Sequence, residues 1–441
     1  MIRAAFRTPG FSRLFAGLAA SMFGDTLMLI VLSMWVKTLT GSNGAAGVTF
    51  LWMTAPALLA PAFGYLVDRV PRRTFLVVAN LASAVMMLPL LLVRDAGDVW
   101  IIYAVAFCYG ISFVVVPAAL NGLLKDLLDE DMLVDANASL SITREAFRLV
   151  GPLLGATVFA LAGGWACALI DAATFVIAAV AVGTLSVRET HRDQPAEHTG
   201  WREEVVAGLT FIRRTPLLLH TTLGLSIALL VIGFTESAIY AVLDAFGKPV
   251  TFVGPLLTVQ GAGAIVGGLV ASRIVRRIGE PLGVVLGLSV LAVGVAGTAA
   301  AVDLWQLLVS VAVVGSGLPV TLVAFNTLLQ RQTPGRLMGR VSTTIEVLTT
   351  TPQAISIGTG AVLVGLLDYR LIFAIIAAGL LVAAVYPTVM LRGRLRPQPA
   401  PESGDPEETA AAVIPGTVLP EPLVPVPPTI SEKTAPTAAQ R

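Results

Sequence analysis

Long apolar segments separated by short polar connections dominate the chain. Segments of about twenty apolar residues can cross a bilayer as helices, because hydrocarbon offers the backbone no partner outside the helix itself. Twelve such segments lie at residues 14–36, 46–67, 74–93, 99–123, 139–162, 165–187, 218–243, 252–272, 281–302, 304–329, 342–366 and 370–391. The polar stretch 188–217 separates the first six from the last six. The pattern predicts an all-α membrane protein with twelve transmembrane helices.

A charged turn occurs twice in this apolar chain. Residues 64–73 read GYLVDRVPRR, and residues 267–277 read GGLVASRIVRR, so that arginines recur at a constant offset of 204 positions. A repeated turn of this kind indicates two homologous membrane halves, here two pseudo-symmetric six-helix bundles. The predicted parts are an N-terminal bundle (1–187), a cytoplasmic linker (188–217) with an amphipathic helix over 201–214, and a C-terminal bundle (218–395). A disordered, proline-rich cytoplasmic tail follows at 396–441.

Basic residues gather on every second connection between the apolar segments. They include Arg72 and Arg73 after the second segment, Arg213 and Arg214 before the seventh, and Arg276 after the eighth. Because Lys and Arg stay on the cytoplasmic side, both termini and the central connector are predicted to be cytoplasmic. The expected location is the inner membrane of a bacterial cell, crossed many times.

Composition excludes several classes of protein. Hydrophobic residues make up 56% of the chain and charged residues 13%, unlike an ordinary soluble domain. The net charge of +1 argues against a nucleic-acid partner. The sequence shows no metal-binding, nucleophile or phosphate-loop pattern, so we expect no enzyme, no metal and no cofactor. Cys108 and Cys167 lie inside apolar segments, where they are interpreted as packing residues.

The first charged turn resembles the G-x-L-x-D-R-x-x-R-R signature of the major facilitator superfamily, and departs from it at Val70 and Pro71. Further stretches resemble the branch that holds macrolide-efflux proteins, enterobactin-type siderophore exporters and related actinobacterial multidrug exporters. These stretches are residues 21–25, 117–120, 136–138, 150–155, 208–216 and 339–342. The resemblance covers about residues 1–395 and implies the major facilitator fold and an exporter.

Asp25 is the strongest single candidate for a functional residue. It lies twelve positions from Arg13 and twelve from Lys37, about 18 Å from each at 1.5 Å per residue, near the bilayer midplane. A carboxylate there costs several kcal/mol unless it is paired, hydrated or protonated. We expect Asp25 to couple transport to protons. The alternative is a protonated acid that only bonds a neighbouring helix.

Arg148 lies at a similar depth and is the predicted partner of Asp25, since helices 1 and 5 are neighbours in the superfamily fold. In this interpretation it stabilises the charged carboxylate in one conformation and releases it in the other, with Glu145 on the same helical face. The alternative is a static ion-pair cluster of Arg144, Glu145 and Arg148.

Two other acids lie within apolar segments. Glu236 is in the outer half of helix 7, which lines the cavity in this fold, and it is expected to attract a cationic drug or carry a second proton. A gate residue that reaches water is the alternative. Asp171 is a weaker candidate, because helix 6 is peripheral in this fold and the residue is only six positions from Trp165 near the outer surface.

Gly151, Pro152 and Gly155 resemble the G-P-x-x-G core of a motif found in exporters of the superfamily. Proline bends a helix and glycines permit close approach of a neighbour, so these residues predict a seam between the halves that favours export. The alternative is an ordinary proline kink.

The charged turns are expected to form a cytoplasmic latch, in which Asp68 faces the N-terminus of a helix from the other half. Positive-inside topology alone is the alternative explanation of the arginines. The latch residues are Gly64, Asp68, Arg69, Arg72, Arg73, Arg273 and Arg277.

Met and aromatic side chains of helices 1, 4, 7 and 10 are the candidates for the substrate cavity, and lipid-facing packing is the alternative for each. They are Met22, Leu29, Tyr109, Phe113, Phe234 and Tyr240.

These features together predict a secondary active transporter. It would export amphipathic, macrolide-like small molecules by proton antiport and alternating access, driven by the proton gradient. The expected partners are the substrate and the lipid bilayer, and the expected state is a monomer. A dedicated exporter of one natural product, such as a siderophore, and a non-transporting membrane sensor or assembly partner are the two alternatives. The substrate, the proton stoichiometry and the role of the tail are left open.

Overall fold

The computed structural model describes residues 6, 8–59, 70–128, 130–185 and 201–392. Long helices account for nearly all of them. In the first half these are α1 (Pro9–Thr40), α2 (Asn43–Thr54) with a 3-10 turn at Ala55–Leu59, α4 (Arg72–Met87), α5 (Val99–Leu127), α6 (Glu130–Ala162) and α7 (Gly164–Gly183). In the second they are α9 (Pro216–Ala245), α10 (Val253–Ile278), α11 (Glu280–Ala300), α12 (Leu304–Gln332), α13 (Met338–Leu363) and α14 (Tyr369–Met390), preceded by α8 (Trp201–Arg214).

Each of the twelve predicted segments overlaps one of these helices, and the predicted all-α membrane fold class is confirmed. Within the described residues, ten helices are long and apolar enough to cross a membrane. The other two have separate explanations. Helix α2 has only 12 residues, and the predicted segment 46–67 runs into residues that lie outside the described part. Helix α13 is long but rich in Ser and Thr.

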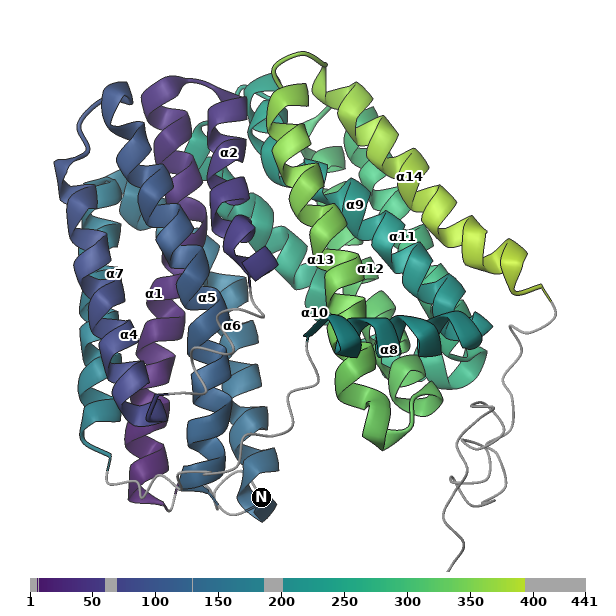
Figure 1. The fold of residues 1–441 in the computed structure, drawn as a ribbon. Coiled ribbons are helices and arrows are strands. Elements are labelled where there is room, and N and C mark those ends of the chain that lie inside the picture. Colours follow the sequence, from purple (N-terminus) through teal and green to yellow (C-terminus); the bar gives the residue numbers. More distant parts are fainter. Residues whose placement is uncertain (1–5, 7, 60–69, 129, 186–200, 393–441) are drawn as a thin grey trace, which may run out of the picture. The chain divides into compact units, whose positions relative to one another are not determined.

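Helix packing divides the described helices into two sets (Figure 1). In the first set α1 contacts α2, α6 and α7, while α5 contacts α2 and α4. In the second set α9 contacts α13 and α14, and α12 contacts α10 and α11. The sets meet where α6 packs on α10 and where α2 packs on α13 and α9. The predicted boundaries at 187, 217 and 395 stay predictions, and the predicted tail lies outside the described residues.

The turn from α1 to α2 shows how local sequence sets the helix ends. Gly41 ends α1 with φ 69°, a left-handed conformation that suits glycine, and its N–H bonds the Lys37 carbonyl. The Ser42 side chain then accepts a hydrogen bond from the Ala45 N–H and caps α2. We call this end of the helices the far side, and the opposite end, which carries Arg72, Arg213 and Arg276, the basic side.

Helix α8 packs against the second set of helices and runs across them in Figure 1. A Cβ on Gly208 would collide with the backbone of Arg340 in α13, so glycine permits this close approach. Thr344 Oγ1 donates a hydrogen bond to the Val205 carbonyl at 3.2 Å, and Ile212 is fully buried. The apolar face of α8 is therefore covered by protein.

Candidate functional site

Asp25 lies in the middle of α1 and is held by neutral hydroxyl groups. Tyr109 of α5 donates a hydrogen bond from its hydroxyl to Oδ1 of Asp25 at 2.8 Å. Ser21, one helical turn earlier on α1, donates to Oδ2 at 3.5 Å. The predicted mid-membrane carboxyl therefore has two partners, and neither of them is charged.

Asp171 of α7 packs against Gly24, the residue next to Asp25 on α1. Asp171 is 0% exposed. Its Oδ1 accepts a hydrogen bond from Thr174 Oγ1 at 3.2 Å, and its Oδ2 has no hydrogen-bond partner among the described residues. The charge of Asp171 acts on Tyr109, and the charge of Asp25 acts on Asp171.

Close packing of α1 on α7 explains this burial. A Cβ on Gly24 would collide with Asp171 and Thr174, and a Cβ on Gly17 would meet the Ala178 backbone at 3.2 Å. The two glycines are seven positions apart, which places them on one face of α1. Small residues allow membrane helices to approach closely. The Gly17–Gly24 spacing is the sequence signal that identifies the face against which Asp171 is buried.

Arg148 does not pair with Asp25, so the predicted ion pair is absent from the described residues. Arg148 is exposed on α6, and its charge acts on Glu236 of α9 in the other half. The cation whose charge reaches Asp25 is Arg144. Arg144 lies seven positions before Gly151, on the α6 face that meets α1. Arg144 and Arg148 lie at similar depths along α6. Their positions around the helix differ, so Arg144 acts on Asp25 and Arg148 acts on Glu236.

Glu145 and Glu236 have different environments. Glu145 is exposed on α6 beside Arg144, and Glu236 is partly buried on α9. One turn beyond Glu236, the Tyr240 hydroxyl bonds Ser33 Oγ of α1 at 2.5 Å. Helix α9 of the second half therefore contacts α1 of the first half at Tyr240. Glu236 lies one turn before this buried contact.

The exporter motif meets both halves, but through different atoms than predicted. A Cβ on Gly151 would lie 2.6 Å from the Thr26 Cβ, and one on Gly155 would lie 2.7 Å from the Leu27 carbonyl. Both contacts are with α1, in the same half. The seam to the other half is formed where Gly254 of α10 packs against the Pro152 carbonyl, which a Cβ on Gly254 would approach to 2.8 Å. Sequence reasoning missed Gly254.

Three of the predicted latch residues, Gly64, Asp68 and Arg69, lie outside the described residues. Arg72 donates to the Gly122 carbonyl at 3.2 Å and forms an ion pair with Asp126 of α5 at 3.0 Å. Arg73 donates to the carbonyls of Val182 and Gly183, at the end of α7. These contacts join helices of one half. Arg273 and Arg277 are exposed on α10.

The predicted cavity residues fall into two groups. Tyr109 and Tyr240 are at most 1% exposed, and their hydroxyls bond Asp25 and Ser33, so both belong to the packed interior. Leu29 and Phe113 are 40% and 42% exposed. Met22 and Phe234 are partly buried, and Phe234 packs on Gly360 of α13. A buried hydroxyl needs a hydrogen-bond partner, and these bonds therefore allow the two tyrosines to be buried.

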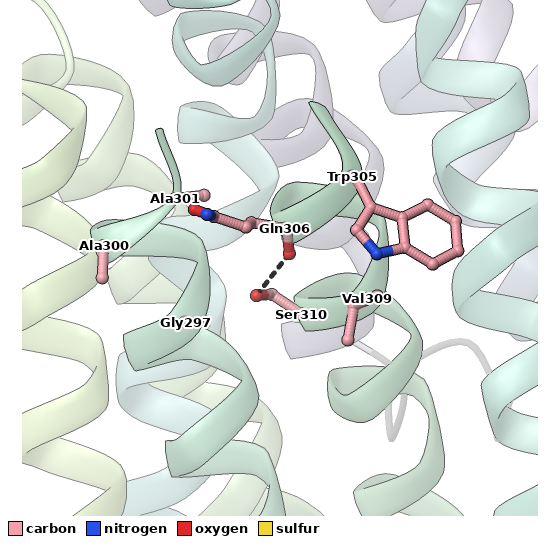
Figure 2. Close-up of a pocket in the computed structure, with 7 residues that line it drawn as sticks. All are labelled: Gly297, Ala300, Ala301, Trp305, Gln306, Val309 and Ser310. Atoms are coloured by element: carbon pink, nitrogen blue, oxygen red, sulfur yellow. Dashed lines mark hydrogen bonds between the residues drawn. The ribbon is translucent and has the colours of Figure 1, made fainter. Parts of the chain in front are cut away.

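A cavity of about 360 Å³ lies elsewhere, between the end of α11 and the start of α12 (Figure 2). Its polar groups are already bonded: Gln306 N donates to Asp303 Oδ1 at 2.8 Å, and Ser310 Oγ donates to the Gln306 carbonyl at 2.7 Å. The other lining residues are Gly297, Ala300, Ala301, Trp305 and Val309. Within the described residues, no group of three His, Cys, Asp or Glu side chains is placed to hold a metal. The cavity lined by Gln306 and Ser310 is separate from the site around Asp25.

Comparison with known proteins identifies the family. The chain is 26% identical over 382 residues to the uncharacterized MFS-type transporter YfiS of Bacillus subtilis, covering 82% of this chain and 89% of that protein. It is 27% identical over 362 residues to the multidrug efflux pump Tap of Mycobacterium tuberculosis, covering 77% and 83%.

Solved structures share the fold at low sequence identity. A mutant of the nucleoside transporter NupG matches with a TM-score of 0.70 and 13% identity, over 87% of this chain and 99% of that chain. A bacterial homologue of the iron transporter ferroportin, in its inward-facing state, matches with a TM-score of 0.65 and 16% identity, over 87% and 98%. The sequence model of the Major Facilitator Superfamily matches residues 14–349 and also residues 225–432. With its helices arranged as in these transporters, the chain is a multi-pass membrane transporter, not an enzyme, and belongs to the Major Facilitator Superfamily.

Proposed function

We propose that this transporter exports amphipathic small molecules by proton antiport and alternating access. The observation that carries the proposal is the environment of Asp25, a carboxyl in the middle of a membrane helix whose hydrogen-bond partners, Tyr109 and Ser21, are both neutral. A carboxyl without a fixed cationic partner can gain and lose a proton without breaking an ion pair. Such a group is suited to coupling transport to a proton gradient.

Three observations support export of drug-like molecules. The relative Tap, at 27% identity, is named a multidrug efflux pump. Exposed apolar side chains at Leu29 of α1 and Phe113 of α5 offer an adaptable surface for amphipathic ligands. The close packing of Gly254 on the Pro152 carbonyl fits the exporter motif, since it seals α6 against α10 in the other half.

A dedicated exporter of an anionic natural product, such as a siderophore, is the second candidate. Arg144 and Arg148 are both exposed on α6 and lie four positions apart, so they share one face of the helix. Two cations on one face favour an anionic ligand. Glu236 acts in the opposite sense, because it faces the charge of Arg148 from the other half and would attract a cation.

The proposed setting is the inner membrane of a bacterial cell, with both termini in the cytoplasm. The basic side of the helices, which includes Arg72, Arg213 and Arg276, supports this orientation. The transporter would act as a monomer, driven by the proton gradient and without a cofactor.

Inverted membrane vesicles that hold a pH gradient test the function. A panel of macrolides, tetracyclines, cationic dyes and siderophores is added to vesicles with the wild type or Asp25→Asn at equal expression, and proton release is followed with a pH-sensitive dye. Release by a drug that disappears in Asp25→Asn supports proton antiport through Asp25. Release by siderophores alone favours the dedicated exporter.

Asp303→Asn is the matched control, because Asp303 caps α12 on the far side and Asn caps a helix about as well as Asp. This variant is expected to release protons as the wild type does. Release that persists in Asp25→Asn would refute coupling through Asp25. No release with any ligand, in folded protein, would refute proton antiport of these compounds.

A further inference from the structure

Two carboxyl groups converge on one tyrosine inside the first half. Asp25 of α1 accepts a hydrogen bond from the Tyr109 hydroxyl at 2.8 Å. The charge of Asp171 on α7 acts on the same Tyr109, and the charge of Asp25 acts on Asp171. Asp171 also packs against Gly24, the residue next to Asp25 on α1. Tyr109 is 1% exposed and its ring contacts Phe113 and Phe175, so the tyrosine is fixed between the two acids.

The burial of Asp171 restricts its charge. The residue is 0% exposed, and Thr174 Oγ1 donates a hydrogen bond to its Oδ1 at 3.2 Å. Oδ2 has no partner among the described residues. An ionised carboxylate in this position would leave an unpaired charge in an apolar interior, which costs several kcal/mol. The neutral acid avoids this cost.

The neighbouring helices supply no cation that pairs with Asp171 in the described residues. Helix α1 presents Asp25, α5 presents Tyr109, and α7 itself carries Cys167 one turn before Asp171. Helix α4 also packs on α7, but its charged residues, Arg72 and Arg73, lie in its first turn on the basic side. On α6 the charge of Arg144 reaches Asp25, and it is not among the charges that act on Asp171.

We propose that Asp25, Tyr109 and Asp171 form one proton-sharing site, in which Asp171 holds a proton in this conformation and Asp25 exchanges one with water. The proton enters from water and returns to it, so no other reactant is needed. Tyr109 keeps its hydroxyl proton throughout. The two carboxyl groups together carry one proton when Asp25 is ionised and two when Asp25 is neutral. This inference rests on the proposed function, and it identifies Asp171 and Tyr109 as further members of the coupling site.

The proton on Asp25 would change the hydrogen bonding of the group. An ionised Asp25 accepts the Tyr109 hydrogen bond as a charged acceptor, and charge-assisted hydrogen bonds are the stronger kind. Protonation of Asp25 weakens this hydrogen bond and with it the contact between α1 and α5. The same packing of Gly24 that buries Asp171 keeps α7 against α1, so α1 would move with α7 relative to α5.

Infrared spectroscopy of the purified full-length protein tests the site without a substrate or a gradient. A protonated carboxyl gives a C=O stretching band distinct from the carboxylate bands. The wild type is expected to show such a band at neutral pH, and Asp171→Asn is expected to lose it. Asp303→Asn, on the far side, is the control and is expected to keep it. A band that persists unchanged in Asp171→Asn would overturn the proposal.

Coupling between the acids is measured by titrating the same band. In Asp25→Asn the pH at which the Asp171 band disappears is expected to shift by about one unit or more, as for coupled sites. Tyr109→Phe preserves the shape of the ring and is expected to shift the bands of both acids. It remains a test if Asp171→Asn does not fold. An unchanged band in Tyr109→Phe, or an unchanged midpoint in Asp25→Asn, would refute a shared site.

The infrared experiment tests the shared site and the transport experiment tests antiport, so either proposal can be refuted without the other. A coupled infrared titration without proton release in vesicles would support the shared site and refute the proposed antiport. Proton release that depends on Asp25 while Asp171 shows no protonated band would support antiport and refute the shared site.

Discussion

Lys37 Nζ lies 2.7 Å from Oδ2 of Asp244, although the two residues are 207 positions apart in the chain. Lys37 belongs to the last turn of α1 and Asp244 to the last turn of α9, so the ion pair joins the two halves on the far side. The Lys37 side chain is 8% exposed and that of Asp244 is 48% exposed. Asn43 of α2 donates a further hydrogen bond to Oδ2 at 3.1 Å. A largely buried ammonium is therefore matched to a carboxylate that still reaches solvent.

Asp244→Asn is expected to lower the free energy of unfolding by about 1–2 kcal/mol, because a charged hydrogen bond to a buried ammonium is lost. In alternating access this contact must break when the far side opens, so the variant should also favour separation of α1 from α9 there. Thermal unfolding measures the first effect. Hydrogen exchange at the far-side ends of α1 and α9 measures the second, and it is expected to become faster.

The charge-swapped pair Lys37→Asp with Asp244→Lys is expected to recover part of the loss. Arg94→Ala is the control, since Arg94 is an exposed far-side cation whose side chain has no bond within the described residues. Equal exchange rates in wild type and Asp244→Asn would show that this ion pair does not hold the helices together.

Two adjacent glycines of the repeated turn are predicted to respond in opposite ways to alanine. A Cβ on Gly267 of α10 would meet the Ser316 backbone of α12, with its carbonyl carbon at 2.8 Å, whereas a Cβ on Gly268 would find only Pro319 at 4.0 Å. Gly267→Ala should destabilise the protein by about 1–3 kcal/mol through overpacking. Gly268→Ala should be neutral or stabilise by up to about 1 kcal/mol, since alanine favours helix. Thermal unfolding of the two variants side by side is the measurement, and similar melting temperatures would contradict the packing of α10 on α12.

Arg73 is predicted to matter more for stability than its repeat copy, Arg277. Arg73 donates to the carbonyls of Val182 and Gly183 at the end of α7, where the helix leaves its last carbonyls without internal partners. Arg73→Ala should cost about 1–2 kcal/mol of unfolding free energy. Arg277 is exposed, and Arg277→Ala should change the value by less than about 0.5 kcal/mol. Equal losses in thermal unfolding would show that the α7 carbonyls are not what Arg73 stabilises.

The sequence predicted most of the fold because its signals were local. A run of about twenty apolar residues indicates a membrane helix from local sequence alone, and all twelve predicted segments overlap a helix. Counting residues along one segment predicted that Asp25 lies near the middle of a helix, as it does in α1. Helix α13 shows where hydropathy fails, since its Ser and Thr residues can bond carbonyls of their own helix, as Thr349 does with Ile345.

Partners between helices were predicted less well, because they depend on helical phase and on which faces meet. Counting depth selected Arg148 as the partner of Asp25, whereas the structure places Tyr109 there and relates Arg148 to Glu236. Asp171 was judged a weaker candidate, because helix 6 is peripheral in the superfamily fold and Trp165 is only six positions away. Its burial is set instead by Gly24 on another helix, and one sequence contains no direct record of that contact.

A double-mutant cycle separates the two possible partners of Arg148. The charge of Arg148 acts on Glu236 of α9, and that of Arg144 acts on Asp25. Thermal unfolding of Arg148→Ala with Glu236→Gln should show a coupling of about 0.5 kcal/mol or more, because the two residues interact. Arg148→Ala with Asp25→Asn should be additive within about 0.5 kcal/mol, as for residues without a shared partner. The matched cycle of Arg144→Ala with Asp25→Asn should show coupling. If Arg148 couples to Asp25 and not to Glu236, α6 presents a different face to α1 than in this structure, and the pairing inferred from depth would be correct.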